Sequence, residues 1–304
     1  MNPPKPKAAI RIGFIGAGKL ATHLAWALSE LNYTVQGAYS RGAASAQALC
    51  QPIAARVYDS GQALVDDCDW VFICVPDAAI GACVDALHWG KQHTVIHCSG
   101  ATKLSVMASA ASAGGALAGF HPLRTFSALP ASPQAVLAAF NHCTVGLEAH
   151  GNTLPTLAYL AQGLGARVIH ITADQRALYH AGANYAGAFV TALVKQGAML
   201  WQHLGVSETD ALTALLPLLR STVAALETAQ TQGLTVSAAT VGPVARGDVA
   251  TIQAHCEALA KYEPEALPLY AQLSLAVVPL ALEKGSLSQR DAKTICEILH
   301  KLSV

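Results

Sequence analysis

The sequence has no excess of charge of either sign, and this absence excludes several classes of partner. Nineteen basic and nineteen acidic residues cancel in a chain of 304 residues. Nucleic acids and anionic membrane surfaces attract strongly basic proteins, so neither is an expected partner. The sequence also has no internal repeat, and its polar stretch at residues 228–233 is expected to be a loop. At this length, two domains are expected.

Closely spaced cysteine pairs are absent as well. The eight cysteines include no CxxC pair, so the sequence indicates neither a zinc site nor a disulfide framework. Cys74, Cys83 and Cys98 lie in apolar runs, which is typical of buried, reduced thiols in a cytoplasmic protein. His93 and His97 have HxxxH spacing, but on a predicted strand they would lie roughly 13 Å apart. No metal site is therefore predicted.

None of the long uncharged runs is expected to cross a membrane. Long uncharged runs occur at residues 104–123, 125–147 and 266–282, but they contain prolines and polar residues. Buried elements of a folded domain are expected there. The apolar segment near the N-terminus is interrupted by Lys19 and has no cleavage site, which argues against a secretory signal. The expected protein is cytoplasmic and has no membrane partner.

A glycine turn is the most informative motif that is present. Residues 13–21, GFIGAGKLA, follow an apolar run that begins at Ala8 and precede leucines at helical spacing. This order of strand, turn and helix is typical of dinucleotide binding: Gly16 permits the bend, Gly18 leaves room for a pyrophosphate, and Ala21 lets the helix pack closely. The phosphate would meet the helix N-terminus. The cofactor-binding residues predicted here are Gly16, Ala17, Gly18, Lys19 and Leu20.

The end of the second predicted strand indicates which dinucleotide is bound. NAD-specific turns usually place an acidic side chain there for the ribose hydroxyls. This sequence has Tyr39, Ser40 and Arg41 instead. Ser40 can donate a hydrogen bond, and Arg41 can hold a 2′-phosphate with two parallel hydrogen bonds. The sequence therefore predicts NADP as the cofactor, although a polar turn that happens to hold an arginine is the structural alternative.

The first half of the chain alternates strands with helices. Such alternation predicts a doubly wound, mostly parallel α/β sheet of the Rossmann type over residues 1–172. The last two strands, near residues 142–148 and 166–171, flank a helix and are expected to extend the sheet. The strands are predicted near residues 8–16, 34–39, 56–58, 69–77, 93–100, 116–120, 142–148 and 166–171.

The second half, residues 173–304, is predicted to be an all-helical domain. Helices are expected at residues 174–204, 207–227, 248–262, 264–284 and 288–302, with Thr172 or Asp174, Ser207 and Asp248 as N-caps of the first three. The first helix has small residues on several faces. It therefore suits the centre of a domain or of a dimer.

Polar residues follow two of the strands that should complete the cofactor crevice. Ligands of open α/β sheets bind at the carboxyl ends of the strands, which places Val75, Pro76 and Asp77 beside the nicotinamide and ribose. Ser99 would lie across from them as a candidate catalytic residue. Structural roles are open for both polar side chains: Asp77 could cap a helix at residues 78–87, and Ser99 a helix that starts at residue 102.

Two segments could supply proton transfer. FHPLRTF places His121 just after a strand, where the following proline fixes the loop. YHAGAN places Tyr179, His180 and Asn184 early on the first helix of the second domain, and His180 and Asn184 share one face. Of these, His121, His180 and Asn184 are candidate catalytic residues and Tyr179 is a candidate substrate-binding residue. With twelve histidines in the chain, a purely structural imidazole is the alternative for each.

A third segment, GPVARGD, presents Arg246 in a loop bounded by glycines and a proline. A rigid loop of this kind is suited to hold an arginine for a substrate carboxylate. Asp248 in the same loop is expected to cap the next helix and to orient Arg246.

Taken together and in this order, these motifs resemble a bacterial family of NADP-binding oxidoreductases that join a Rossmann-like domain to a C-terminal domain of unknown function of the DUF2520 type. More distantly, the arrangement is similar to pyrroline-5-carboxylate reductases, ketopantoate reductases and β-hydroxyacid dehydrogenases. The resemblance implies a 6-phosphogluconate-dehydrogenase-like fold and a helical, dimer-forming second domain. β-Hydroxyacid dehydrogenases place a lysine four residues before the asparagine on that helix. Here His180 precedes Asn184, which leaves histidine as the candidate acid.

The sequence therefore predicts an NADP(H)-dependent oxidoreductase that acts on a small carboxylate-bearing carbonyl, imine or hydroxy compound and forms a homodimer. Ketopantoate reduction is the most concrete version. A cyclic imine reductase resembling pyrroline-5-carboxylate reductase is one alternative, because an iminium needs only modest acid catalysis. The other alternative is a dinucleotide-binding sensor or partner protein without catalysis, since the family's lysine is missing.

Overall fold

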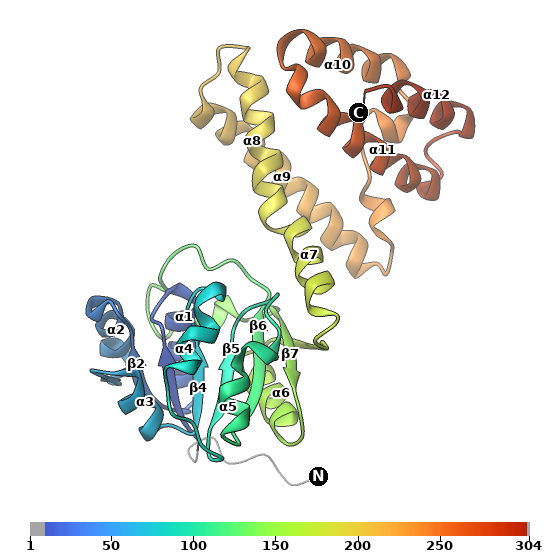
Figure 1. Cartoon of the computed structure of the whole chain (residues 1–304). Helices are drawn as coiled ribbons and strands as arrows, with labels where there is room; N and C mark the ends of the chain where they lie inside the picture. The colour runs from blue at the N-terminus through green and yellow to red at the C-terminus, as the bar shows by residue number, and fades with distance from the viewer. Residues whose placement is uncertain (1–9, 303–304) are drawn as a thin grey trace. The chain divides into compact units, whose positions relative to one another are not determined.

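The computed structural model describes residues 10–302 and divides into two compact units, residues 1–187 and 188–304 (Figure 1). Each unit is described separately. Ala8, where the first strand is expected to begin, lies outside the described residues. The predicted domain boundary at residue 172 precedes the division between the units by one helix.

The first unit is built on an eight-stranded sheet in the order β3-β2-β1-β4-β5-β6-β7-β8. All neighbouring strands are parallel except β6 and β7, which run antiparallel. The strand order reverses beside β1, which is where open α/β sheets bind their ligands. The predicted fold class is confirmed, including the two added strands. The strands are β1 (Arg11–Ile15), β2 (Thr34–Tyr39), β3 (Arg56–Val57), β4 (Trp70–Ile73), β5 (Thr94–His97), β6 (Ala116–Pro122), β7 (Thr144–Ala149) and β8 (Arg167–His170).

Two apolar cores cover the two faces of this sheet, because alternate strand residues point to opposite sides. On one face Phe14 stacks on Phe72, and Phe120 meets the edge of the Phe72 ring, beneath α1, α2 and α6. The neighbouring residues Ile15 and Ile73 belong to the core on the other face, beneath α3, α4 and α5. The helices of this unit are α1 (Lys19–Glu30), α2 (Ala43–Cys50), α3 (Gly61–Asp67), α4 (Ile80–Asp85), α5 (Ala108–Ser112), α6 (Thr153–Gly163) and α7 (Arg176–Ala186).

The long helix predicted for residues 174–204 is wrong. The structure contains two helices, α7 and α8 (Ala188–Gln202), separated at Gly187, whose φ of −111° and ψ of −94° are not helical. α7 belongs to the first unit. The predicted caps, Thr172 or Asp174, are also wrong. α7 begins after Gln175, and the Gln175 side chain accepts a hydrogen bond from the backbone N–H of Thr172. Sequence spacing did not reveal the interruption because the apolar pattern continues through Gly187.

The second unit is helical, as predicted. Ser207, Asp248 and Ser288 each accept a hydrogen bond from a backbone N–H in the first turn of the helix that follows. The two predicted caps, Ser207 and Asp248, are therefore confirmed. The loop expected at residues 228–233 is largely wrong, since α9 continues to Thr231. The remaining helices are α9 (Glu208–Thr231), α10 (Val249–Tyr262), α11 (Leu267–Lys284) and α12 (Gln289–His300).

Two helical stretches in the described part of the chain are long and apolar enough, by length and composition, to cross a membrane. They are α9 and residues Pro264–Lys284, and 6% and 22% of their most apolar windows are buried. Two such helices are weak evidence for a membrane protein, because helices that pack against other protein pass the same test.

Candidate active site

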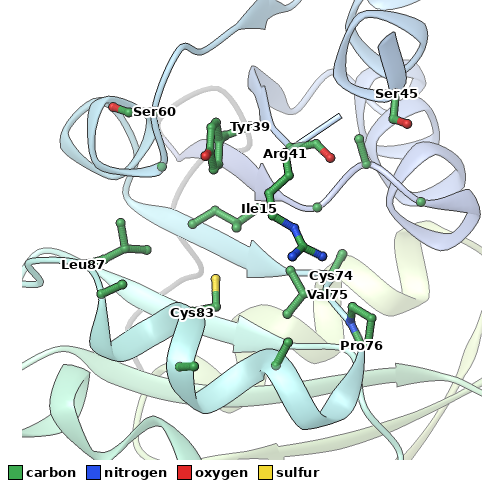
Figure 2. A pocket seen from close by; sticks show the side chains of 18 of the residues that line it. Ile15, Tyr39, Arg41, Ser45, Ser60, Cys74, Val75, Pro76, Cys83 and Leu87 are labelled. Carbon is green, nitrogen blue, oxygen red and sulfur yellow. The ribbon is translucent and has the colours of Figure 1, made fainter. Parts of the chain in front are cut away.

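A cavity of about 760 Å³ lies along the carboxyl ends of the strands on both sides of the strand-order reversal. Figure 2 shows the Arg41 side chain directed into it, between Ile15 and Tyr39 on one side and Val75 and Pro76 on the other. A cavity of this size is sufficient for a dinucleotide's adenosine half. The predicted cofactor residues that line it are Gly16, Ala17, Gly18, Ser40, Arg41, Val75 and Pro76.

The two glycines of the turn have different reasons to be glycine. Gly16 has a φ of +93°, and a Cβ atom there would lie 2.5 Å from the carbonyl oxygen of Cys74, so the fold itself requires glycine. Gly18 has an ordinary φ of −79°, and a Cβ atom there would meet no atom within 4 Å. No packing demand explains Gly18. The space that it leaves open lies at the uncapped N-terminus of α1, where a phosphate would bind.

Three predicted cofactor residues lie outside this cavity. The ammonium group of Lys19 donates a hydrogen bond to the carbonyl oxygen of Ser127, and Leu20 packs against the core. Asp77 follows Pro76 directly, but its carboxylate accepts a hydrogen bond from the hydroxyl of Ser99. Sequence reasoning missed Ser60, Gly61 and Gln62, which also line the cavity. Because β3 has two residues and ends just before this segment, the rule that ligands bind at strand carboxyl ends could have identified it.

Asp77 and Ser99 form a hydrogen-bonded link between the ends of β4 and β5. The Ser99 hydroxyl donates to the Asp77 carboxylate at 2.6 Å and accepts from the backbone N–H of Thr102 at 3.0 Å. The alternative roles as helix caps are wrong: Asp77 lies inside a short 3₁₀ turn (Asp77–Ala79), and the next helical turn after Ser99 (Leu104–Met107) has Lys103 at its N-cap position. Both side chains hold the crevice edge in place.

His121, Tyr179 and His180 meet beside this link. The Nδ1 atom of His121 lies 2.9 Å from the hydroxyl oxygen of Tyr179, and the rings of His121 and His180 are 5.9 Å apart. Both imidazoles close over Gly100: a Cβ atom there would lie 2.5 Å from Cδ2 of His180 and 2.8 Å from Cε1 of His121. Three candidate residues from two separate motifs, His121, Tyr179 and His180, therefore form one cluster within the first unit, next to Ser99.

Burial determines the protonation states of His121 and Tyr179. It lowers the pKa of His121 to about 4, and the neighbouring His180 and the positive charge of Arg176 act in the same direction. Burial also raises the pKa of Tyr179 to about 12. At neutral pH the Tyr179 hydroxyl is therefore protonated, and His121 is a neutral imidazole.

The tautomer of His121 follows from the other partner of Tyr179. The phenol oxygen is also near the backbone N–H of Gly146, so we expect its own proton to be donated to Nδ1 of His121. Nδ1 is then the acceptor, and Nε2 carries the proton of the neutral ring. In that tautomer, Nε2 of His121 is an N–H donor beside Gly100.

Beneath the cluster lies an ion pair that sequence reasoning missed. Arg176 is fully buried, and its Nε atom donates to the carboxylate of Glu148 on β7, which is also buried. Its Nη1 atom donates to the carbonyl oxygen of Ser99 at 2.9 Å. No sequence motif distinguished Arg176 from the chain's other arginines, because its role depends on the sheet register below it.

The other two candidate residues are Asn184 and Arg246. Asn184 is one turn beyond His180 on α7, and its side chain forms no hydrogen bond to any described residue. Arg246 ends a 3₁₀ turn (Val244–Arg246) in the second unit; it is exposed and forms no salt bridge within residues 10–302. Asp248 bonds to Thr251 as the cap of α10, and the nearby charge of Arg246 contributes to lowering its pKa.

Two family models match the chain. Residues 11–100 match the family described as NADP oxidoreductase, coenzyme F420-dependent, and residues 143–277 match the domain of unknown function DUF2520. No curated protein matches the chain by sequence.

Solved structures show the same fold. A protein from Bacteroides fragilis assigned as an NADP oxidoreductase has 24% identity and a TM-score of 0.66, covering 89% of this chain and 98% of that one. A reductive aminase from Aspergillus terreus in complex with NADPH has 17% identity and a TM-score of 0.62, covering 95% and 99%. Pyrroline carboxylate reductase from Plasmodium falciparum with NADP bound has 12% identity and a TM-score of 0.56, covering 98% and 100%.

The Rossmann-type sheet, the cavity at its reversal point and the family match define an NADP-dependent oxidoreductase. Within that class, the nucleotide-binding part of the chain is followed by a region that matches DUF2520. The predicted enzyme class and cofactor are thereby confirmed.

Proposed function

We propose that the protein uses NADPH to reduce a small, carboxylate-bearing compound with a C=N or C=O bond. The observation that supports this proposal is the His121–Tyr179–His180 cluster at the carboxyl edge of the sheet, next to the strand end that carries Val75 and Pro76. NADPH supplies a hydride to the carbon of such a bond. The protein must then supply a proton to the nitrogen or oxygen.

The two histidines divide this task. His121 is kept neutral by burial and bonded by Tyr179, so its Nε2–H is suited to donate a hydrogen bond to a carbonyl or carboxylate oxygen of the substrate. His180 is half-buried, lies beside His121 and has no hydrogen bond to another described side chain. We assign the proton transfer to His180. Ser99 and Asp77 keep the crevice edge in place, and Asn184 is a further candidate for contact with the substrate.

A neutral His121 favours an imine over a ketone as substrate. An iminium carbon is already activated, so its reduction needs less acid catalysis than reduction of a carbonyl group. The neighbours with this fold include a reductive aminase and pyrroline carboxylate reductase. A cyclic imine with a carboxylate is therefore the first substrate to try, followed by 2-oxo acids such as ketopantoate.

The test is NADPH oxidation by the purified protein with a panel of cyclic imines and 2-oxo acids. We expect turnover to fall at least 100-fold in His180→Asn, and by less in His121→Asn, with NADPH binding retained in both. Turnover that is unaffected in the double variant would exclude the proposed roles. Absence of turnover with every compound, despite NADPH binding, would support the non-catalytic sensor.

Arg246 is proposed as the partner of the substrate carboxylate, because it is an exposed guanidinium without a salt bridge to any described residue. Arg246→Ala should raise KM for carboxylate-bearing substrates by about 10-fold to 100-fold. The matched control is an analogue without the carboxylate, whose KM should not change. Equal effects on both compounds would contradict the assignment.

A homodimer is proposed from the large apolar side chains that α7 exposes in the first unit and α9 exposes in the second. Leu178 is 79% exposed and Leu218 is 63% exposed, and almost none of the apolar window of α9 is buried within the chain. Soluble monomers rarely expose so many large apolar side chains on their helices. A second copy would cover this surface without requiring a membrane.

A further inference from the structure

Arg176 has hydrogen bonds in two directions from one buried guanidinium. One arm donates to Glu148 on β7, and another donates to the carbonyl oxygen of Ser99 just after β5, at 2.9 Å, with the carbonyl oxygen of Gly100 at 3.5 Å. Fully buried charges are costly unless they are paired and hydrogen bonded. The guanidinium therefore links β7 to the turn on which the two histidines meet.

The sheet contains glycines where this link crosses it. His97 on β5, Gly119 on β6 and Glu148 on β7 are register partners on adjacent strands. A Cβ atom at Gly119 would lie 1.8 Å from Nη2 of Arg176. The guanidinium thus lies directly on the backbone of β6, and any side chain at Gly119 would displace it.

The same arrangement is repeated two residues along the sheet. Gly146 on β7 pairs with His121 on β6. A Cβ atom at Gly146 would lie 2.7 Å from the hydroxyl oxygen of Tyr179. Two side chains of α7, Arg176 and Tyr179, therefore reach the sheet backbone over two glycines.

Helix geometry connects these contacts to the cluster. Tyr179 and His180 follow Arg176 by three and four residues, so the three side chains share one face of α7. When Arg176 is fixed to the sheet at one end of this face, the next turn can present Tyr179 to His121 and His180 to Gly100. The Ser99 and Gly100 carbonyls are fixed by the same guanidinium.

We propose that Arg176, paired with Glu148, is a positioning residue that holds the first turn of α7 and the Ser99–Gly100 backbone so that His121 and His180 meet over Gly100. Its purpose in catalysis rests on the reductase function proposed above, whereas the arrangement itself can be tested without a substrate. An ion pair that only stabilised the fold would leave the tautomer of His121 unchanged in variants that still fold.

The experiment observes the imidazole nitrogens of the full-length protein, labelled with ¹⁵N at histidine, by NMR. His121 is assigned from its absence in His121→Asn, and NADPH binding verifies that each variant is folded. In the wild type, we expect His121 to show one fixed tautomer, with Nδ1 unprotonated and Nε2 protonated. Tyr179→Phe removes the hydrogen bond directly and should give averaged tautomers.

The decisive variant is Arg176→Gln combined with Glu148→Gln, which removes both charges and leaves no unpaired carboxylate. We expect averaged His121 tautomers, as in Tyr179→Phe, with an NADPH dissociation constant within about 3-fold of wild type, because neither residue lines the cofactor cavity. Arg176→Lys keeps the charge but cannot reach both partners, so it should restore the fixed tautomer only in part.

If the double variant does not fold, Gly119→Ala tests the same proposal by displacing the guanidinium without removing it. Averaged tautomers in every variant that folds support the positioning role. A fixed His121 tautomer in either folded variant overturns it. Because no substrate is used, a failed substrate screen would count against the proposed function and leave this result intact.

Discussion

At the scale of single residues, four glycines are the most informative about function. At each of them, the distance from an added Cβ atom to its neighbours shows whether the fold requires glycine. Gly16, Gly119 and Gly146 are required by the protein's own atoms. Gly18 is not, and the space beside it is open. The sequence motif identifies both turn glycines, but only the structure separates the one that the fold needs from the one that the ligand needs.

This difference predicts opposite effects for two alanine substitutions. Gly18→Ala should leave the thermal midpoint unchanged and weaken NADPH binding by at least about 10-fold, because the added methyl group lies where the pyrophosphate approaches. Gly16→Ala should instead lower stability, since its φ is positive and its Cβ meets Cys74. Calorimetric unfolding and NADPH titration measure the two effects. Unchanged NADPH affinity in Gly18→Ala would contradict the assignment.

The buried imidazole of His97 predicts a pH dependence of stability. Burial, aided by the charge of Arg176, lowers its pKa from 6.5 to about 3. Between these values the unfolded chain binds a proton that the folded chain does not, so the free energy of unfolding should decrease as the pH falls, by up to about 1.4 kcal/mol per pH unit.

Urea unfolding between pH 7 and pH 5 measures this slope. It should be shallower in His97→Gln, which removes the titrating group, provided that the variant folds. The matched control is His88→Gln, which removes an imidazole from an exposed position. Equal changes of slope in both variants would show that burial of His97 is not the cause.

At the scale of elements, the sequence predicted most of what depends on local pattern. The apolar runs identified the strands, and short polar side chains identified the caps of α9 and α10. It failed at Gly187, where the apolar pattern continues but the helix does not. It also missed Arg176 and Glu148. Arg176 on α7 reaches Glu148 over Gly119, its register partner on β6, and this pairing of β6 with β7 is not visible along the chain.

The cap of α12 provides a test at this scale. The Ser288 hydroxyl accepts from the backbone N–H of Asp291 and donates to its carboxylate. Ser288→Ala should lower the free energy of unfolding of the second unit by about 1 kcal/mol. Thr294→Ala is the control, because this hydroxyl bonds within the helix to Arg290 and caps nothing. Equal losses in both variants would mean that the cap contributes nothing specific.

At the scale of the whole molecule, the apolar exposed face of α9 predicts the state of assembly. We expect a homodimer in light scattering, and Leu218→Glu should shift it toward monomer by placing a charge in the interface. Leu129→Glu, at another exposed leucine outside α7–α9, is the control and should remain dimeric. A monomeric wild-type protein would contradict the proposal, and binding of that protein to lipid vesicles would point to a membrane for the same helices.

The interruption of the helix at Gly187 has a consequence for how the chemistry is housed. Because α7 ends there and belongs to the unit that contains the sheet, His121 and His180, the two proposed catalytic histidines, belong to the same unit as the cofactor cavity. Residues of the second unit can then vary without changing these two histidines. Substitutions after residue 187 would then alter substrate choice and leave the cofactor cavity, His121 and His180 unchanged.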